Sequence, residues 1–217
     1  MGTTIGKFII GLLTKFLAIA GKDFCLIAAD TRISEGYGIV SRNYSRSTEL
    51  TPKCVITSSG MVADIEALHK TLIMKVKIYR RQHNGKYPDT ESLAELLMNT
   101  LYSRRFMPYY AFNLLCGLTK QGEGVVYGYD AIGSYSTLSY GVQGTGQEMA
   151  SPLLDNQFVG HNHLVKKVAE NQQDVEAAAK DMIHSIAERD IYTGDNVELV
   201  VIRPDGVSTR REPIRRD

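Results

Sequence analysis

The stretch from Leu17 to Arg32 most strongly constrains what this chain can fold into. Two apolar runs, Phe16 to Ala20 and Phe24 to Ala29, flank Gly21-Lys22-Asp23. A short glycine-containing break between β-prone runs predicts a hairpin. Because both runs are apolar at consecutive positions, we expect two strands inside a sheet that is covered on both faces. Asp30 follows the second run, where its carboxylate is either a structural cap or part of a site.

Length and composition favour one folded domain. A chain of 217 residues, 43% hydrophobic and 23% charged, is long enough to bury a sizeable core. Its net charge of +1 gives no electrostatic reason to expect nucleic acid or an anionic membrane as partner. The odd set of Cys25, Cys54 and Cys116 contains no Cys-x-x-Cys motif, which fits a reducing compartment better than a disulfide framework.

The first twenty residues imitate a secretory signal. Lys7 precedes the apolar run Phe8 to Leu13, and Ala18-Ile19-Ala20 looks like a cleavage site. Lys15 interrupts that run, however, and cleavage after Ala20 would remove the first core strand. We therefore expect no secretion, and no other apolar stretch approaches the ~20 residues that span a bilayer.

The rest of the chain alternates groups of strands with pairs of helices. Apolar spacing, caps and turns predict strands at Cys54–Thr57, Tyr109–Leu118, Val125–Asp130, near Ser134–Tyr140, and at Val197–Ile202 with Val207–Arg210. They predict helices over Met61–His83, from Thr90 through Leu101, after Gly144-Thr145-Gly146, and from a cap at Asp174 through Ala187. Such segregated runs predict an α+β domain with antiparallel sheets between helical layers.

Several short blocks stand in a fixed order along the sequence: Leu17 to Arg32, Ser59-Gly60, Tyr102 to Tyr110, Gly133-Ser134-Tyr135, Leu153 to Gln157 and Ala187 to Gly194. Together they resemble a proteasome beta subunit, and look most like the members at the sixth position of the beta ring. The resemblance covers nearly the whole chain from Leu17 onward.

This resemblance implies the four-layer α-β-β-α sandwich of the N-terminal nucleophile hydrolases, with antiparallel sheets. In active members an N-terminal threonine hydroxyl attacks the scissile carbonyl, the threonine's own amine takes the proton, and a lysine tunes the pair. A carboxylate orients the lysine, and a backbone N–H at a Ser-Gly stabilises the oxyanion. We expect no cofactor and no metal.

Five positions of this chain match the family's functional pattern. Asp30 fills the carboxylate slot and Gly60 the oxyanion slot. Thr145 is the small hydroxyl in Gly-x-Gly, and Asp190 with Thr193 is the supporting pair near the end of the chain.

The nucleophile and lysine slots depart from that pattern. Counting without gaps places them at Thr14 and Arg46. Thr14 follows two leucines, whereas self-cleavage in the family needs a glycine before the threonine, and an internal threonine has no free amine. Arginine is effectively never deprotonated, and its planar head does not replace a compact ammonium. We therefore interpret the site as vestigial, with Asp30, Asp190 and Thr193 retained as hydrogen-bonding groups that hold strand ends and loops together.

A second register starts from Gly2-Thr3-Thr4-Ile5. Omitting Gly6 to Phe16 would join Ile5 to Leu17 and bring Thr3 into the nucleophile slot. Our hypothesis is that Gly6 to Phe16 is an insert, such as a retained intron in the gene model. We accordingly divide the chain into an extension or insert over residues 1–16 and one proteasome-type beta domain over residues 17–217. Neither register restores the lysine, since Lys53 lies further on, at the start of the next strand.

Three other features have a functional and a plain interpretation. His161 and His163 suggest a metal site but are more simply solvated loop histidines. The Tyr102 to Tyr110 run, rich in aromatics and arginine, is typical of a subunit contact. The resemblance places Asp130 beside a neighbouring subunit's specificity pocket, while the alternative is an aspartate that caps its own turn.

The sequence therefore predicts a non-catalytic structural beta subunit of the proteasome core particle, in cytoplasm and nucleus. Its expected partners are other beta subunits in its own and the opposite ring, alpha-ring subunits, and unfolded polypeptides in the chamber. One alternative is an active threonine peptidase subunit that uses Thr3 or Thr14 after processing. The other is a free-standing amide hydrolase or binding protein of the same fold.

Overall fold

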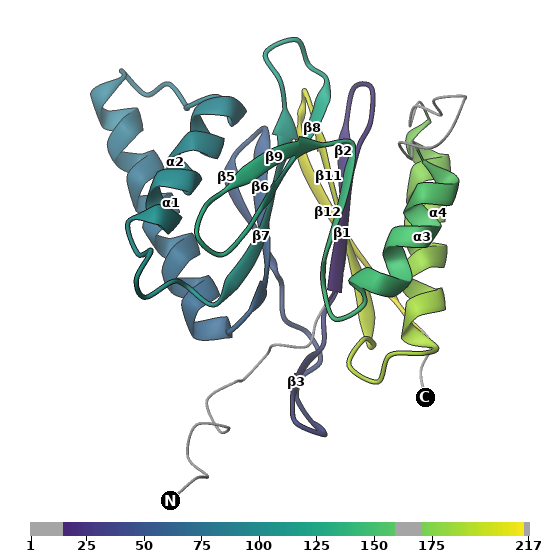
Figure 1. The fold of residues 1–217 in the computed structure, drawn as a ribbon. Coiled ribbons are helices and arrows are strands. Elements are labelled where there is room, and N and C mark those ends of the chain that lie inside the picture. The colour runs from purple at the N-terminus through teal and green to yellow at the C-terminus, as the bar shows by residue number, and fades with distance from the viewer. Residues whose placement is uncertain (1–14, 159–170, 215–217) are drawn as a thin grey trace, which may run out of the picture.

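Two five-stranded antiparallel sheets face each other between two pairs of helices in the computed structural model, which describes residues 15–158 and 171–214 (Figure 1). Helices α1 and α2 cover the outer face of one sheet, and α3 and α4 cover the other. This arrangement confirms the predicted four-layer α-β-β-α sandwich. None of the helices in the described residues is long and apolar enough to cross a membrane.

The first sheet contains the hairpin predicted around Gly21. Its strand order is β10-β1-β2-β11-β12, with bounds β1 Lys15–Ala20, β2 Cys25–Asp30, β10 Tyr140–Gly144, β11 Asn196–Arg203 and β12 Gly206–Pro213. The pairing of β1 with β2 runs from Phe16 opposite Ala29 to Ala20 opposite Cys25. All six residues of β2 are buried, because β1 and β11 flank this strand and both sheet faces are covered.

The second sheet has the order β5-β6-β7-β8-β9. Its bounds are β5 Ser47–Thr51, β6 Cys54–Gly60, β7 Ala111–Leu118, β8 Gly124–Tyr129 and β9 Tyr135–Leu138. Helices α1, Val62–Gln82, and α2, Thr90–Tyr102, bury their apolar stripes on this sheet, including Leu68, Leu72 and Leu97. Asp89 caps α2 by accepting a hydrogen bond from the Ser92 backbone N–H at 2.8 Å.

Among the described residues, three apolar clusters hold the layers together. One lies under α1 and α2, one lies under α3, Gln147–Gln157, and α4, Gln172–Ala187, and the third fills the space between the sheets. The third cluster includes Phe16, Ile27 and Leu114, each fully buried. Fully burying one such side chain contributes roughly 1.5–3 kcal/mol. The cluster as a whole therefore stabilises the packing of one sheet on the other.

Four short strands and one helix cap differ from the sequence prediction. The short strands β3, Ile33–Glu35, and β4, Gly38–Ser41, form a small separate sheet, and β5 and β10 extend the main sheets. These strands are short, polar or glycine-containing, so they give a weak periodic signal. The prediction that Asp174 caps the fourth helix is wrong, because Asn171 is the cap and accepts from the Gln173 backbone N–H.

Strand β1 begins at Lys15, two residues before the predicted start of the domain. Phe16 pairs with Ala29 and Gln143 and is fully buried. In this chain the segment next to Leu17 therefore occupies the central sheet. The division at residue 17, and the hypothesis of an insert, stay predictions.

Candidate functional site

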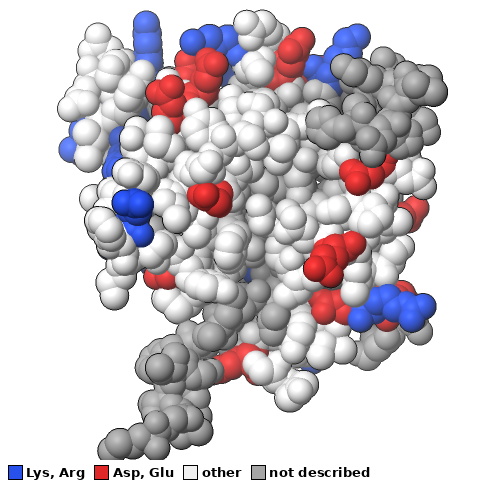
Figure 2. All heavy atoms as spheres, viewed as in Figure 1, with Lys and Arg blue, Asp and Glu red and all other residues white. Residues whose placement is uncertain are grey.

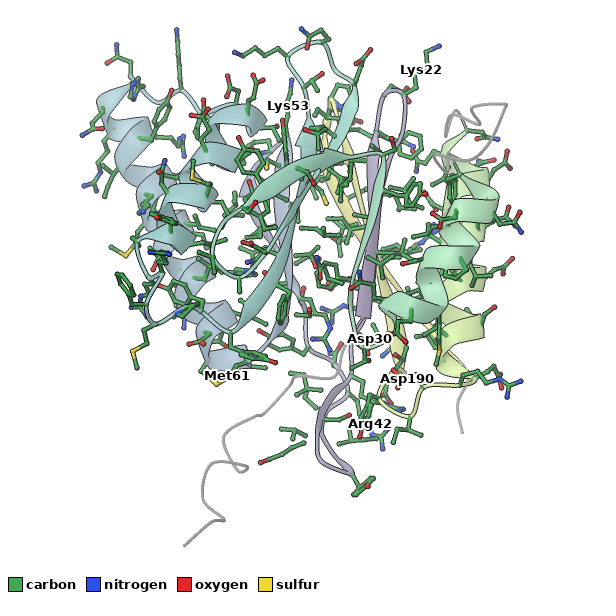
Figure 3. The ribbon with its side chains drawn as sticks, in the orientation of Figure 1. Lys22, Asp30, Arg42, Lys53, Met61 and Asp190 are labelled. Carbon is green, nitrogen blue, oxygen red and sulfur yellow. The ribbon has the colours of Figure 1, made fainter. Side chains whose placement is uncertain are left out.

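The predicted site positions gather at one end of the sandwich. Asp30 ends β2, Arg46 immediately precedes β5, and Gly60 ends β6. Figure 3 shows Asp30, Met61 and Asp190 at this end and Lys22 and Lys53 at the other. Lys53, the nearest lysine further along the chain, therefore lies at the opposite end of the sandwich from Asp30.

Arg46 and Asp30 form a completely buried ion pair. The Arg46 Nε lies 3.2 Å from Asp30 Oδ1, and both side chains are 0% exposed. The same Nε donates to the Asp30 backbone carbonyl at 2.9 Å, and Nη2 donates to the Arg32 carbonyl. The guanidinium thus binds the carboxylate and the backbone on both sides of the β2–β3 corner. Arg46 Nη1 has no hydrogen-bond partner among the described residues.

This geometry differs from what a tuned lysine would provide. A guanidinium donates through a rigid planar fork, and it stays charged under all conditions that a folded protein tolerates. It neutralises the Asp30 charge and ties down backbone carbonyls, but it does not exchange protons with a neighbouring hydroxyl or amine. The pair thus neutralises a buried carboxylate and anchors two backbone carbonyls.

The backbone conformation at position 60 requires a glycine. Its φ is +124°, a region that side-chain-bearing residues rarely adopt, and a Cβ there would lie 2.2 Å from the Tyr110 carbonyl oxygen. That carbonyl accepts a hydrogen bond from Met61 N at 2.9 Å. The close approach of β6 and the start of β7 thus explains this glycine without catalysis.

Asp190 joins two loops at the same end. Its Oδ2 accepts from Thr193 Oγ1 at 2.8 Å and from Thr145 Oγ1 at 3.2 Å. Thr145 precedes α3, whereas Asp190 and Thr193 lie between α4 and β11. The structure therefore brings these three predicted residues together, in contacts that hold loops.

Sequence reasoning missed an ion-pair network beside Arg46. Asp195 binds Arg32 Nε at 2.7 Å and Arg42 Nη1 at 2.6 Å. Partial burial raises the pKa of Asp195, but the hydrogen bonds from Arg32 and Arg42 outweigh it and hold this pKa below its ordinary value. The network fixes the β2–β3 corner from outside, and no local pattern links residues so far apart in sequence.

A second missed feature is a buried polar chain through α1. His69 Nδ1 lies 2.8 Å from Thr48 Oγ1, and Nε2 lies 2.8 Å from Ser58 Oγ. The Ser58 hydroxyl donates to Asn113 Oδ1, so it accepts from His69 Nε2–H, and Nδ1 accepts from Thr48. Burial lowers the pKa of His69 to about 4, which keeps the imidazole neutral.

These hydrogen-bonded side chains play a structural role, although they include a serine and a histidine. Ser58 is fully buried, so its hydroxyl is out of reach of a substrate. Its hydrogen is directed to Asn113, whereas a nucleophile would donate to the histidine. Their hydrogen bonds join helix α1 to strands β5, β6 and β7. The position of His69 beside Leu68, on the apolar stripe of α1, is the sequence signal that could have revealed it.

Asp130 binds its own loop. Its Oδ1 accepts from the backbone N–H groups of Ile132, Gly133 and Ser134 at 3.0, 2.7 and 2.8 Å. These bonds are the ones expected of an aspartate that caps its turn. Its place in a neighbour's pocket stays a prediction.

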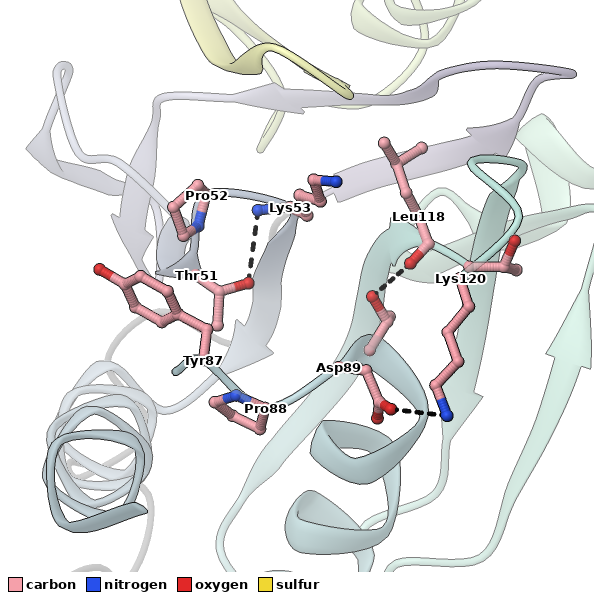
Figure 4. A pocket seen from close by; sticks show the side chains of 10 residues that line it. Thr51, Pro52, Lys53, Tyr87, Pro88, Asp89, Leu118 and Lys120 are labelled. Carbon is pink, nitrogen blue, oxygen red and sulfur yellow. Dashed lines mark hydrogen bonds and ion pairs between the residues drawn. The ribbon is translucent and has the colours of Figure 1, made fainter. Parts of the chain in front are cut away.

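A pocket of about 330 Å³ lies at the far end of the sandwich, where Figure 4 shows Thr51, Lys53, Asp89 and Lys120 around it. Lys120 pairs with Asp89 at 2.9 Å, and the Lys53 backbone N–H donates to Thr51 Oγ1 at 3.3 Å. The Thr90 hydroxyl likewise donates to the Leu118 carbonyl at 2.6 Å, so these contacts pair no hydroxyl with a basic side chain.

The remaining predicted residues lie outside the described ranges. Thr3 and Thr14 fall in residues 1–14, and His161 and His163 fall in residues 159–170. Within the described ranges, no cluster of three or more histidine, cysteine or carboxylate side chains could hold a metal ion.

The fold and this polar end define a class of protein. It is a two-sheet sandwich covered by helices on both outer faces, with a buried Arg46–Asp30 pair and the Asp190 contacts at one end of its sheets. The chain belongs to the proteasome subunit family, because the family model "Proteasome subunit" matches residues 14–202.

Individual relatives agree with this membership. "Proteasome subunit beta type-1" of Arabidopsis thaliana is 46% identical over 206 residues, spanning 93% of this chain and 92% of the relative. The protein of the same name from Dictyostelium discoideum is 44% identical, over 93% of this chain and 86% of its own length. "Proteasome subunit beta type-6" of Saccharomyces cerevisiae is 34% identical, over 93% and 87%.

Proposed function

We propose that this chain is a non-catalytic, structural beta subunit of the proteasome core particle. The single observation that carries the proposal is the Arg46–Asp30 pair, with both side chains 0% exposed. In the family pattern this position belongs to a lysine that tunes a threonine nucleophile. Here a permanently charged guanidinium is committed to a carboxylate and two backbone carbonyls.

The chemical consequence is a missing proton carrier. Threonine catalysis needs a hydroxyl, a free amine and a group that adjusts the amine's proton affinity. Arginine does not exchange its proton, and its planar head is held by the β2–β3 corner. Asp190 and Thr193, bonded to each other at 2.8 Å, then serve as loop contacts.

The role that follows is architectural. As a member of the beta ring, at its sixth position, the chain would close the ring. It would also form part of the wall of the chamber that confines unfolded polypeptides. Its partners would be beta subunits of both rings and alpha-ring subunits, in cytoplasm and nucleus. The names and coverage of the relatives support this assignment.

Electrophilic probes of proteasome active sites test the lack of catalysis. The complex containing a tagged copy of this chain is treated with a fluorescent probe that labels N-terminal threonines, and its subunits are separated on a gel. Active beta subunits in the same sample are the positive control. We expect this chain to be unlabelled, and a labelled band at its mass would contradict the proposal.

The two alternatives give different results. An active peptidase subunit would begin at Thr3 or Thr14 and carry the probe. A free-standing hydrolase or binding protein would elute as a monomer or small oligomer when the native protein is sized, whereas a core-particle subunit elutes with the large complex.

The register of the N-terminus has its own test. Burial and pairing of Phe16 support the register counted without gaps, because the alternative removes Gly6 to Phe16. Sequencing the transcript across this segment decides the matter, since an uninterrupted mature message encoding these residues would refute the insert.

A further inference from the structure

The loop between α2 and β7 exposes an unusual amount of apolar surface. Phe106 is 94% exposed and Met107 is 83% exposed, and Tyr102 and Tyr110 are also exposed. Exposed apolar groups gathered on one segment, unlike single ones scattered over a surface, mark sites that another macromolecule covers. We call the segment Tyr102 to Tyr110 the aromatic loop.

Two arginines lie among these side chains. The Arg105 guanidinium lies 5.4 Å from the Phe106 ring centroid and 6.0 Å from that of Tyr102, and Arg104 lies 4.4 Å from the ring of Tyr109. No carboxylate among the described residues forms an ion pair with either guanidinium. Aromatic, methionine and arginine side chains are the types enriched in protein–protein interfaces.

The aromatic loop is also held in a defined shape. The backbone N–H groups of Arg104, Arg105 and Met107 donate to the carbonyls three residues earlier, at 3.0, 3.1 and 3.0 Å. At the loop's end, Tyr110 N donates to Asp64 Oδ2 at 2.8 Å. A rigid loop loses little conformational entropy on association, so its exposed side chains are preorganised for a partner.

We propose that the aromatic loop is a contact surface for another subunit of the same complex, one that presents an apolar hollow rimmed by carboxylates. Phe106 and Met107 enter the hollow, and Arg104 and Arg105 pair with the acidic rim. Charge complementarity selects this occupant, because the loop supplies two unneutralised cations and no anion. The proposal rests on the proposed function, since it requires that the chain is a subunit.

The first experiment is a competition for incorporation. Tagged Arg105→Glu/Phe106→Ser and the untagged natural chain are produced together, and their ratio is measured by mass spectrometry in the purified complex. We expect the double variant to be depleted about 30-fold, as for loss of an interface hot spot. The matched control, Arg105→Lys/Phe106→Tyr, keeps the charge and the ring and is expected to be incorporated within about twofold of the natural chain. Both variants should unfold in urea like the natural chain, since these side chains are exposed.

A second experiment locates the contact. With Phe106 replaced by p-benzoylphenylalanine, irradiation of the purified complex is expected to join this chain to one other subunit, at a peptide containing Asp or Glu. The proposal is wrong if the first double variant is incorporated like the natural chain, or if position 106 forms no cross-link to another subunit. If the natural chain itself is absent from the complex, the proposed function fails and this surface with it, so the two failures are distinguishable.

Discussion

Replacing Arg46 by methionine is the perturbation most closely tied to the site. It leaves the Asp30 carboxylate buried without its cation and removes donors from the carbonyls of Asp30 and Arg32. Breaking a buried ion pair by removing one partner costs about 3–5 kcal/mol. We therefore expect the free energy of unfolding to fall by at least about 3 kcal/mol, and the melting temperature to fall by roughly 6–20 °C for a domain of this size.

Arg42→Met is the matched control. Arg42 also binds a carboxylate, that of Asp195, but its side chain is 63% exposed, and Asp195 keeps its bond to Arg32. Exposed pairs contribute about 0–1 kcal/mol. The same chemical change at the two arginines thus separates buried pairing from the general loss of a charge.

Asp30→Leu/Arg46→Met tests the electrostatic cause. Removing both charges eliminates the uncompensated carboxylate, so the double variant should be more stable than Arg46→Met alone. Part of the loss should remain, because the two backbone carbonyls still lack their donor. Equilibrium urea unfolding of the full chain, followed by far-ultraviolet circular dichroism, measures all four proteins. If Arg46→Met and Arg42→Met lose equal stability, or the double variant is less stable than Arg46→Met, the reasoning is refuted.

Three further predictions concern other parts of the structure. Since the pKa of buried His69 is lowered to about 4, its contribution to stability is complete above about pH 6.5 and is lost as the pH falls toward 4. The loss totals about 3 kcal/mol. Urea unfolding measured at a series of pH values should show this loss in the natural chain and in the control His83→Gln. In His69→Gln the stability should fall by about 3 kcal/mol less over the same pH range. Gly60→Ala should lower the free energy of unfolding by at least about 2 kcal/mol, because the strain of a positive φ adds to a backbone clash. Gly122→Ala, where φ is also positive but the space is open, should lower it by about 1 kcal/mol. Similar urea midpoints for the two variants would contradict this. Asp130→Asn should change the peptide preference of a neighbouring active subunit in the purified complex, and unchanged kinetics on a peptide panel would leave only the turn-capping role.

Much of the fold could be predicted because its core strands are strongly patterned. The double-sided burial of β1 and β2 follows from consecutive apolar residues on either side of Gly21, and the stripe of α1 follows from Leu68 and Leu72 at helical spacing. Strands β3, β4, β5 and β10 were missed because short polar or glycine-containing segments carry little periodicity. Their positions depend on tertiary contacts, not on local preference.

For the candidate site, the sequence could predict positions but not the contacts that the side chains make. Asp30, Arg46 and Asp190 were predicted as site positions, and these predictions did not include that Arg46 binds backbone carbonyls as well as the carboxylate. Asp195 and His69 were missed because their partners lie far away in sequence or on other elements. Long-range pairing of polar groups leaves no periodic trace, so only coordinates reveal it.

The most direct test of the central claim is the intact mass of this chain, isolated from the assembled complex after treatment with an electrophilic active-site probe. The account predicts one mass that is identical with and without the probe, while active subunits of the same sample gain the probe's mass. A shortened chain that begins at Thr3 or Thr14 and carries one probe molecule would contradict it.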